Sequence, residues 1–382
     1  MTTWGKYRLG DVAEIIMGQS PKGDSCNKDN RGVPLLNGPT EFGLYYPVPV
    51  QYTIDPKKVS EKKDILFCVR GSTTGRMNFS DQKYAIGRGI AAIRGKQDNT
   101  KFCKYIIDYY LNDLLNITTG STFPNLSKND LNDFEVDIPP LPEQRRIAEI
   151  LGSLDDKIEL NLEMNKTLEQ MAMLLYKRWF VDEAKTGLIG DYIKVQGGYA
   201  FKSKDFNKQG NSGIIKIKNI SMGYVDISNI QFVDEDIVKT ISQDKFKIKS
   251  CDILIAMTGA EIGKIGIVEN TNKDIWVNQR VGKIIEKVPY GSLVAYLAYR
   301  EKEGQEYIKN VCSGSAQENI SSSDLEAMEF ESYDKRIVDS FGKTVYPLFE
   351  KIKFNLAQNR LLAEIRDTLL PKLISGEVRV KV

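Results

Sequence analysis

Two loops of this 382-residue sequence carry hydroxyl and cationic side chains around a matching pair of glycines. Glycine lets another molecule approach the backbone closely, and hydroxyl, guanidinium and ammonium groups donate hydrogen bonds to phosphate oxygens and other acceptors. The pattern therefore predicts loops that bind a polar partner. The glycines are Gly71 and Gly75, then Gly259 and Gly263; the donors are Ser72, Thr73, Thr74 and Arg76 in the first loop, and Thr258 and Lys264 in the second.

A longer polar loop is also repeated. Residues 120–131 and 314–325 are identical at six of twelve positions, and both are rich in hydroxyl and amide groups. Ser127 and Asp130 have the spacing of a capping box, which predicts the start of a short helix rather than a ligand contact. The other polar candidates are Ser121, Thr122 and Asn125 in the first copy, and Ser315, Gln317 and Asn319 in the second.

Histidine and several common catalytic motifs are absent from the sequence. It contains no histidine, which excludes Ser-His-Asp and Cys-His mechanisms and histidine metal sites. It also lacks a Gly-x-Gly-x-x-Gly loop, an Asp/Asn-Pro-Pro-Tyr/Phe tetrapeptide and a Walker A motif. The five cysteines stand far apart, which favours reduced thiols over a zinc site or a disulfide framework. We therefore expect a binding protein with neither a catalytic nor a metal site of its own.

Further matches in the same order indicate that the chain is a duplication. Residues 9–11 (Leu-Gly-Asp) correspond to 189–191 (Ile-Gly-Asp), and Asp-Ile-Leu occurs at both 64–66 and 252–254. These matches keep their order at a nearly constant offset, which chance similarity at one site does not explain. The sequence thus predicts two similar structural units.

Each copy has a mixed front and a helical tail. The fronts, residues 1–140 and 186–333, contain short β-type runs between turn residues, with helical patches among them. The tails, residues 141–185 and 334–382, repeat apolar and asparagine side chains in steps of three and four, the seam spacing of a coiled coil. We expect an α+β protein: two similar α/β domains separated by two long antiparallel helices, the first from residue 143 to about 180.

Two asparagines occupy seam positions in each tail. A buried amide costs stability, but it fixes the register because any slip leaves it without a partner. In an antiparallel pair Asn161 would face Asn359 and Asn165 would face Asn355, so we predict that these four residues set the helix register. The alternative is that the asparagines simply point to solvent.

The second tail contains four additional residues. The offset between the copies is 190 residues at Arg146 and Arg336, but 194 from Leu154 and Leu348 onward. The inserted segment includes Pro347, and proline removes a backbone donor from a helix. We expect a kink or a fresh helical start at this point.

Composition and charge say little about the partner. The net charge is only +2, so any binding to a nucleic acid depends on where the basic residues lie rather than on their number. The apolar runs are all shorter than the roughly 18 residues that a membrane helix needs, and the first residues do not resemble a secretory signal. We expect a cytoplasmic protein without a membrane partner.

The order of these features resembles the specificity subunits of type I restriction–modification systems. The resemblance covers essentially the whole chain and includes the entry to the first helix at residues 139–147 (Pro-Pro-Leu-Pro-Glu-Gln-Arg-Arg-Ile). It also includes Arg-Trp-Phe-Val-Asp at residues 178–182 and the final segment from Leu369 to Val380. Each motif is moderately specific, whereas their order is highly specific.

The resemblance implies a function and a set of partners. Each front would be a target recognition domain that reads one half of a bipartite double-stranded DNA site, and the helices would set the gap. Two methyltransferase subunits carrying S-adenosylmethionine, and restriction subunits using ATP and Mg²⁺, would be the partners; no cofactor is expected in this chain. The copies differ at residues 122–124 (Thr-Phe-Pro) and 316–318 (Ala-Gln-Glu), so the DNA site should be asymmetric.

Given this resemblance, the repeated loops are the candidates for DNA contacts. Glutamine pairs with adenine N6 and N7, which makes Gln317 a candidate adenine reader. Arginine pairs with guanine O6 and N7, which makes Arg88 or Arg280 a candidate guanine reader, and Gln279 lies beside Arg280.

Two other functions remain compatible with the sequence. One is a stand-alone DNA-binding regulator without methyltransferase partners, which would be soluble alone and bind DNA tightly. The other is a repeat protein that scaffolds other proteins and has no role on DNA. Salt dependence separates the last from the others, because contacts to phosphates weaken steeply with salt.

Overall fold

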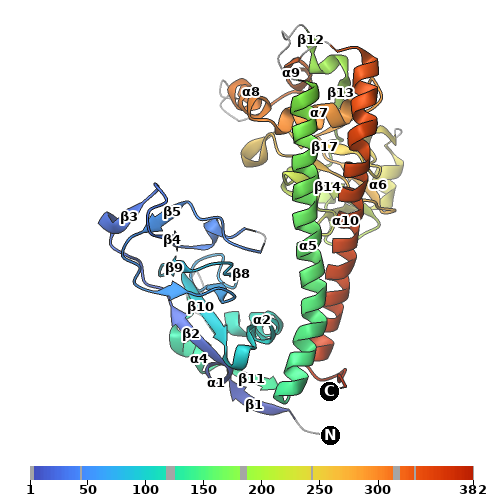
Figure 1. Cartoon of the computed structure of the whole chain (residues 1–382). Coiled ribbons are helices and arrows are strands. Elements are labelled where there is room, and N and C mark those ends of the chain that lie inside the picture. The colour runs from blue at the N-terminus through green and yellow to red at the C-terminus, as the bar shows by residue number, and fades with distance from the viewer. Residues whose placement is uncertain are drawn as a thin grey trace. The chain divides into compact units, whose positions relative to one another are not determined.

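The chain forms two compact units, one made of Met1–Glu159 with Leu362–Val382 and the other of Leu160–Leu361. We call them the first and the second unit. The structure, a computed structural model, describes residues 4–43, 45–117, 125–180, 187–241, 244–312, 319–330 and 333–381. Each unit combines a mixed α/β domain with part of two long helices (Figure 1), so the predicted fold class is confirmed. Within the described residues, helices that are long and apolar enough to cross a membrane are absent.

The domain of the first unit contains two main sheets. The central sheet is antiparallel with strand order β2-β10-β7-β8, and the second is mixed with order β3-β5-β4-β9-β6. The strands of the central sheet are β2 (Ala13–Met17), β7 (Ile65–Cys68), β8 (Met77–Phe79) and β10 (Ile90–Gly95). Those of the second are β3 (Cys26–Asn27), β4 (Val33–Leu36), β5 (Gln51–Thr53), β6 (Val59–Ser60) and β9 (Tyr84–Ile86).

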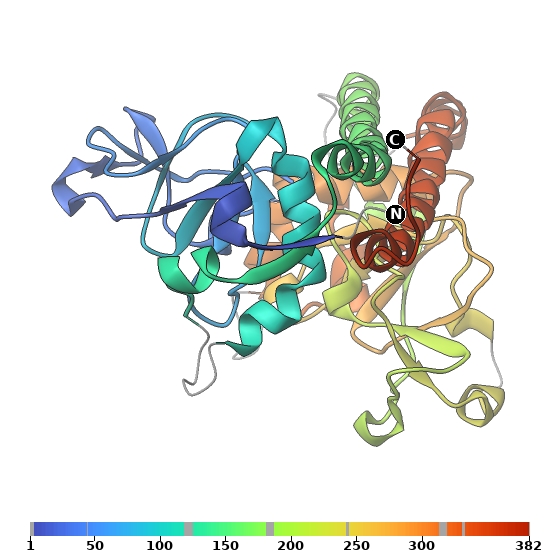
Figure 2. The same cartoon turned by 90° about the horizontal axis from the view of Figure 1, so that it is seen from below.

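Alternating side chains bury both faces of the central sheet. Ile65 and Phe67 on β7 pack in one cluster with Ile107 of α2 (Thr100–Tyr109), whereas Leu66 packs with Leu36 of the second sheet. Successive strand residues point to opposite faces, so a continuous apolar strand serves two cores. Helix α2 therefore covers one face of the sheet (Figure 2), and the second sheet covers the other. The remaining elements are α1 (Leu9–Val12), α3 (Leu111–Asn116), α4 (Lys128–Asn132), β1 (Gly5–Arg8) and its partner β11 (Glu135–Ile138).

The domain of the second unit repeats this arrangement. Its central sheet has strand order β13-β20-β17-β18-β15, and its other sheet has the order β16-β14-β19. One strand pair of the second sheet is parallel in both domains, β4 with β9 and β14 with β19. The predicted duplication is therefore confirmed in the fold. The strands are β12 (Gly187–Leu188), β13 (Ile193–Gly197), β14 (Ser212–Ile215), β15 (Gly223–Tyr224), β16 (Gln231–Val233), β17 (Ile253–Ala256), β18 (Ile265–Ile267), β19 (Asp274–Val277), β20 (Val281–Glu286) and β21 (Glu329–Phe330). The helices are α6 (Glu235–Lys239), α7 (Gly291–Arg300), α8 (Lys302–Cys312) and α9 (Ser322–Glu326).

The two long helices are α5 (Leu141–Trp179) and α10 (Lys335–Ile374). The predicted first helix is thus confirmed, with Pro142 in its first turn, where a missing N–H costs little. The expected fresh helical start at Pro347 is wrong, because α10 runs through this residue without interruption. Four inserted residues are close to one helical turn of 3.6, so the seam continues on the same face. Pro347 itself lies on the exposed side of the helix.

The predicted asparagine pairs form in the second unit. Asn161 Nδ2 donates to Asn359 Oδ1 at 2.7 Å, and Asn355 Nδ2 donates to Asn165 Oδ1 at 2.8 Å. Asn161 also donates to Gln358 Oε1 at 2.8 Å. Asn161 and Asn355 are completely buried, which excludes the alternative that they point to solvent. The contacts are confirmed, whereas the role of these residues in setting the register stays a prediction.

Replacing one member of an asparagine pair should cost more stability than replacing both. In Asn161→Ala the half-buried Asn359 Oδ1 loses the hydrogen bond from Asn161 Nδ2, at an expected cost of about 1–3 kcal/mol in unfolding free energy. In the Asn161→Leu, Asn359→Leu double variant neither amide remains, so the cost should be smaller or reversed in sign. Urea denaturation of the three proteins compares them. A double variant that is less stable than Asn161→Ala would contradict this account.

A second polar network joins the long helices in the first unit. Asp155 of α5 accepts hydrogen bonds from Arg366 Nη1 and Tyr105 Oη, each at 2.7 Å, and from Lys104 Nζ at 3.2 Å. Burial alone would raise the pKa of the Asp155 carboxyl, but these three partners outweigh burial and lower the pKa below its ordinary value of 3.8. The carboxylate therefore stabilises the folded state in its charged form.

Asp155 should contribute a measurable share of the acid sensitivity of this protein. Because its pKa is lower in the folded than in the unfolded state, its contribution is complete above the unfolded value and is lost as the pH falls through the folded value. Asp155→Asn should lower the unfolding free energy by about 3 kcal/mol at pH 7. It should also flatten the loss of melting temperature between about pH 5 and pH 3. Parallel pH profiles of the two proteins would be inconsistent with this role.

Candidate nucleic-acid interface

The two repeated polar loops lie next to each other in each domain. In the first unit Leu126 N donates to Val69 O at 3.0 Å, and Arg70 and Asn125 form an isolated β-bridge. In the second unit Ile320 N donates to Met257 O, also at 3.0 Å, and the bridge joins Thr258 to Asn319. The structure therefore brings together, in both copies, loops that are far apart in the sequence: the bridged residues are 55 positions apart in the first copy and 61 in the second.

A third segment, the turn between the two sheets, completes the arrangement. In the first unit this turn covers residues 86–90, and Val69 N donates to Gly89 O at 2.9 Å. In the second unit it covers residues 277–281, and Met257 N donates to Arg280 O at 3.0 Å. Three loops thus meet where the central sheet joins the second sheet.

These bonds define which residues correspond. Gln19 N donates to Ile86 O, and Tyr199 N donates to Val277 O, both at 2.8 Å. Counting along the turns from these anchors places Arg88 opposite Gln279, and Gly89 opposite Arg280. The two arginines that the sequence suggested as guanine readers are therefore not equivalent in the fold.

In the first unit the predicted loop residues differ in what their side chains do. Ser72, Arg76 and Arg88 are exposed at the surface. Thr74 Oγ1 donates to Gly71 O at 2.7 Å, so this hydroxyl closes the turn internally. Thr73 is half-buried with its hydroxyl 3.7 Å from Cys68 Sγ.

In the second unit the exposed candidates are amides and one arginine. Gln279, Arg280 and Asn319 are exposed, whereas the hydroxyl of Thr258 is buried. Lys264 forms an ion pair with Glu261, which neutralises its charge. Among the described residues of these loops, the second domain therefore presents fewer exposed cations without an ion pair than the first.

Four of the predicted residues, Ser121, Thr122, Ser315 and Gln317, lie outside the described part of the chain. The residues that follow them are described, and Ser127 and Asp130 form the predicted capping box of α4. Ser127 N donates to Asp130 Oδ2 at 2.7 Å, and Asp130 N donates to Ser127 Oγ at 3.2 Å. These two polar side chains are thus occupied in shaping the loop.

Sequence reasoning missed Arg70. This exposed arginine directly precedes the first loop glycine and bridges to Asn125, at the position that Thr258 has in the second unit. With Arg76 and Arg88 it gives the first unit three exposed arginines, two on the first loop and one on the turn between the sheets. Its position next to Gly71 was the available indication in the sequence.

The loop glycines are required by the backbone. Gly71, Gly75, Gly259 and Gly263 all have φ between +69° and +95°, a region that other residues rarely adopt. A Cβ on Gly75 would also lie 2.9 Å from Leu111 of α3. The glycines thus allow the sharp turns of both loops, and Gly75 also allows the close approach of its loop to α3.

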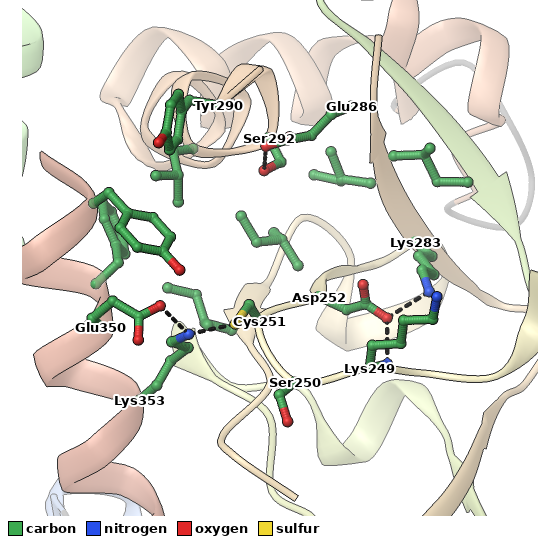
Figure 3. A pocket seen from close by; sticks show the side chains of 17 residues that line it. Lys249, Ser250, Cys251, Asp252, Lys283, Glu286, Tyr290, Ser292, Glu350 and Lys353 are labelled. Carbon is green, nitrogen blue, oxygen red and sulfur yellow. Dashed lines mark hydrogen bonds and ion pairs between the residues drawn. The ribbon is translucent and has the colours of Figure 1, made fainter. Parts of the chain in front are cut away.

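A cavity of about 370 Å³ lies in the second unit beside α10 (Figure 3). Lys353 of α10 contacts both the Glu350 carboxylate and the thiol of Cys251, and Lys283 pairs with Asp252 at 2.5 Å. Burial opposes the charge on Lys353, but its two partners outweigh burial and raise its pKa. Because the charges pair with one another, we assign the cavity a structural role. The contact of Lys353 with Cys251 joins α10 to the residues just before β17. The other end of β17 leads into the interface loop.

The type I restriction modification DNA specificity domain matches residues 1–170 and 182–331 of the chain. The chain is 24% identical to the HindI specificity subunit of Haemophilus influenzae, over 99% of this chain and all of that subunit. It is 38% identical to the putative MjaX specificity subunit of Methanocaldococcus jannaschii, over 44% of this chain and 40% of that protein. A crystal structure of the S subunit of the type I restriction–modification system of M. genitalium superposes with a TM-score of 0.56, at 18% identity, over 97% of this chain and 96% of that one.

The fold defines a protein of two similar domains, each with three polar segments that converge. The family match identifies the class of protein. The chain belongs to the family of type I restriction–modification DNA specificity subunits.

Proposed function

We propose that the chain recognises an asymmetric bipartite DNA site for a type I restriction–modification complex, each domain contacting one half. The observation that carries the proposal is the convergence of the same three polar segments in both domains, within a chain of the specificity family. Loops with exposed arginine and amide side chains suit phosphate and base contacts in DNA. The different residues of the two copies support different half-sites.

The helix pair would set the gap between the half-sites. Two half-sites about one helical turn apart present the same groove to one face of a protein, so a fixed protein spacer selects a number of base pairs. The buried pairs Asn161–Asn359 and Asn165–Asn355 support this role because a shifted register would leave their amides unpaired.

We further propose that the chain is a non-catalytic subunit that assembles with two methyltransferase subunits and with restriction subunits. S-adenosylmethionine, ATP and Mg²⁺ would then bind to those partners rather than to this chain. Large apolar side chains on the long helices support assembly: Leu160, Leu174 and Phe354 in the second unit are 51%, 68% and 52% exposed. Such side chains commonly mark protein–protein contacts.

The arginines beside the first loop should contribute mainly through phosphates. In the complex with methyltransferase subunits, Arg70→Ala with Arg76→Ala should weaken binding to all duplexes by a similar factor. It should reduce the slope of log K against log salt by about 2, since each phosphate contact contributes about 0.9. Titration of labelled duplexes at several salt concentrations measures both quantities.

The matched control is Arg146→Ala, which removes an exposed arginine of α5 that pairs with Glu149 outside the interface. This control should leave the salt slope unchanged. An unaltered slope in the double variant would show that the loops do not contact the DNA backbone. Wild-type complex that retains no duplex even at low salt would overturn the DNA-binding function itself.

A further inference from the structure

The turn between the two sheets carries a different side chain at the same place in each domain. Arg88 in the first unit and Gln279 in the second follow two residues after the anchor carbonyls of Ile86 and Val277. Across the first turn Ile90 N donates to Gly87 O at 3.0 Å, and at the same place in the second Val281 N donates to Asn278 O at 2.9 Å. The main chain is thus held similarly in both turns, and the side chain is the difference.

Both side chains are available to a ligand. Arg88 and Gln279 are exposed, and within the described part of the chain their side chains take part in neither a hydrogen bond nor an ion pair. This distinguishes them from Thr74 and Lys264, whose polar groups have partners inside their own loops.

The neighbours of Arg88 make it the projecting side chain of its turn. It stands between Gly87 and Gly89, and a Cβ at either glycine would lie 2.6 Å from an oxygen of Asn37. The turn is therefore packed too closely on the second sheet to carry other side chains there. The second domain has Asn278 and Arg280 at these places, so its turn presents a wider polar edge.

From these observations we infer that Arg88 and Gln279 are equivalent base-reading positions that select different bases. Arg88 selects a guanine in one half-site, and Gln279 selects an adenine in the other. The guanidinium matches guanine O6 and N7 with two donors, whereas a glutamine amide matches adenine N7 and N6 with one donor and one acceptor. This inference rests on the proposed function. It adds to it the base that one position of each half-site requires.

A reciprocal exchange tests the inference. Full-length chains carrying Arg88→Gln or Gln279→Arg are assembled with their methyltransferase subunits, and bound duplexes are selected from a randomised library and sequenced. Arg88→Gln should change one position of one half-site from guanine to adenine, and Gln279→Arg should change one position of the other from adenine to guanine. Each preference should shift on the order of tenfold or more.

Two further variants make the outcome decisive. Arg88→Ala should lose the guanine preference without gaining one for adenine, and the control Arg146→Gln should leave all positions unchanged. Unaltered bases in both half-sites, or a uniform loss of binding with all preferences kept, would overturn the inference. If wild-type complex selects no bipartite site, the proposed function fails instead.

Discussion

The candidate interface depends on one set of main-chain hydrogen bonds, those that hold the turn between the two sheets against the first polar loop. Val69 and Met257 donate to the carbonyls of Gly89 and Arg280 in their respective domains. The two sheets share a core through alternating strand residues such as Leu66, so the turn that connects them has a fixed place. The loops rest on this junction, and their side chains can diverge without changing the backbone beneath them.

The buried core residues and the exposed loop residues can therefore change independently. This explains why a duplicated domain suits a protein that reads two different sequences. The buried strands β7 and β17 are both continuous apolar runs, whereas positions in the loop after them and in the turn between the two sheets differ. Thr258 replaces Arg70, and Gln279 replaces Arg88. In the second unit the long helices add a polar seam whose paired amides favour one alignment over its neighbours.

Much of this architecture was predictable because it follows from periodicity and repetition. The seam spacing predicts α5 and α10, and antiparallel pairing of the two seams places Asn161 against Asn359, the contact that the structure contains. The fresh helical start expected at Pro347 was wrong because α10 is continuous through this residue, and the four inserted residues make nearly one turn, which keeps the seam on one face. The alternative expectation, a kink at Pro347, stays a prediction.

The interface was only partly predictable. Glycine spacing located the first loop, but the correspondence of Arg88 with Gln279 has no trace in the sequence, since Gly-Arg-Gly and Asn-Gln-Arg do not align by identity. That correspondence follows only from hydrogen bonds between distant segments. Arg70 was missed for the same reason, because its closeness to Asn125 is a property of the fold.

The most direct test of the account is a map of methylated bases in the DNA of cells with and without this gene, in the presence of its methyltransferase partner. The account predicts a gene-dependent set of methylated sites that consist of two different half-sites separated by one constant gap. Methylation that does not depend on the gene, or sites that are contiguous or symmetric, would contradict it.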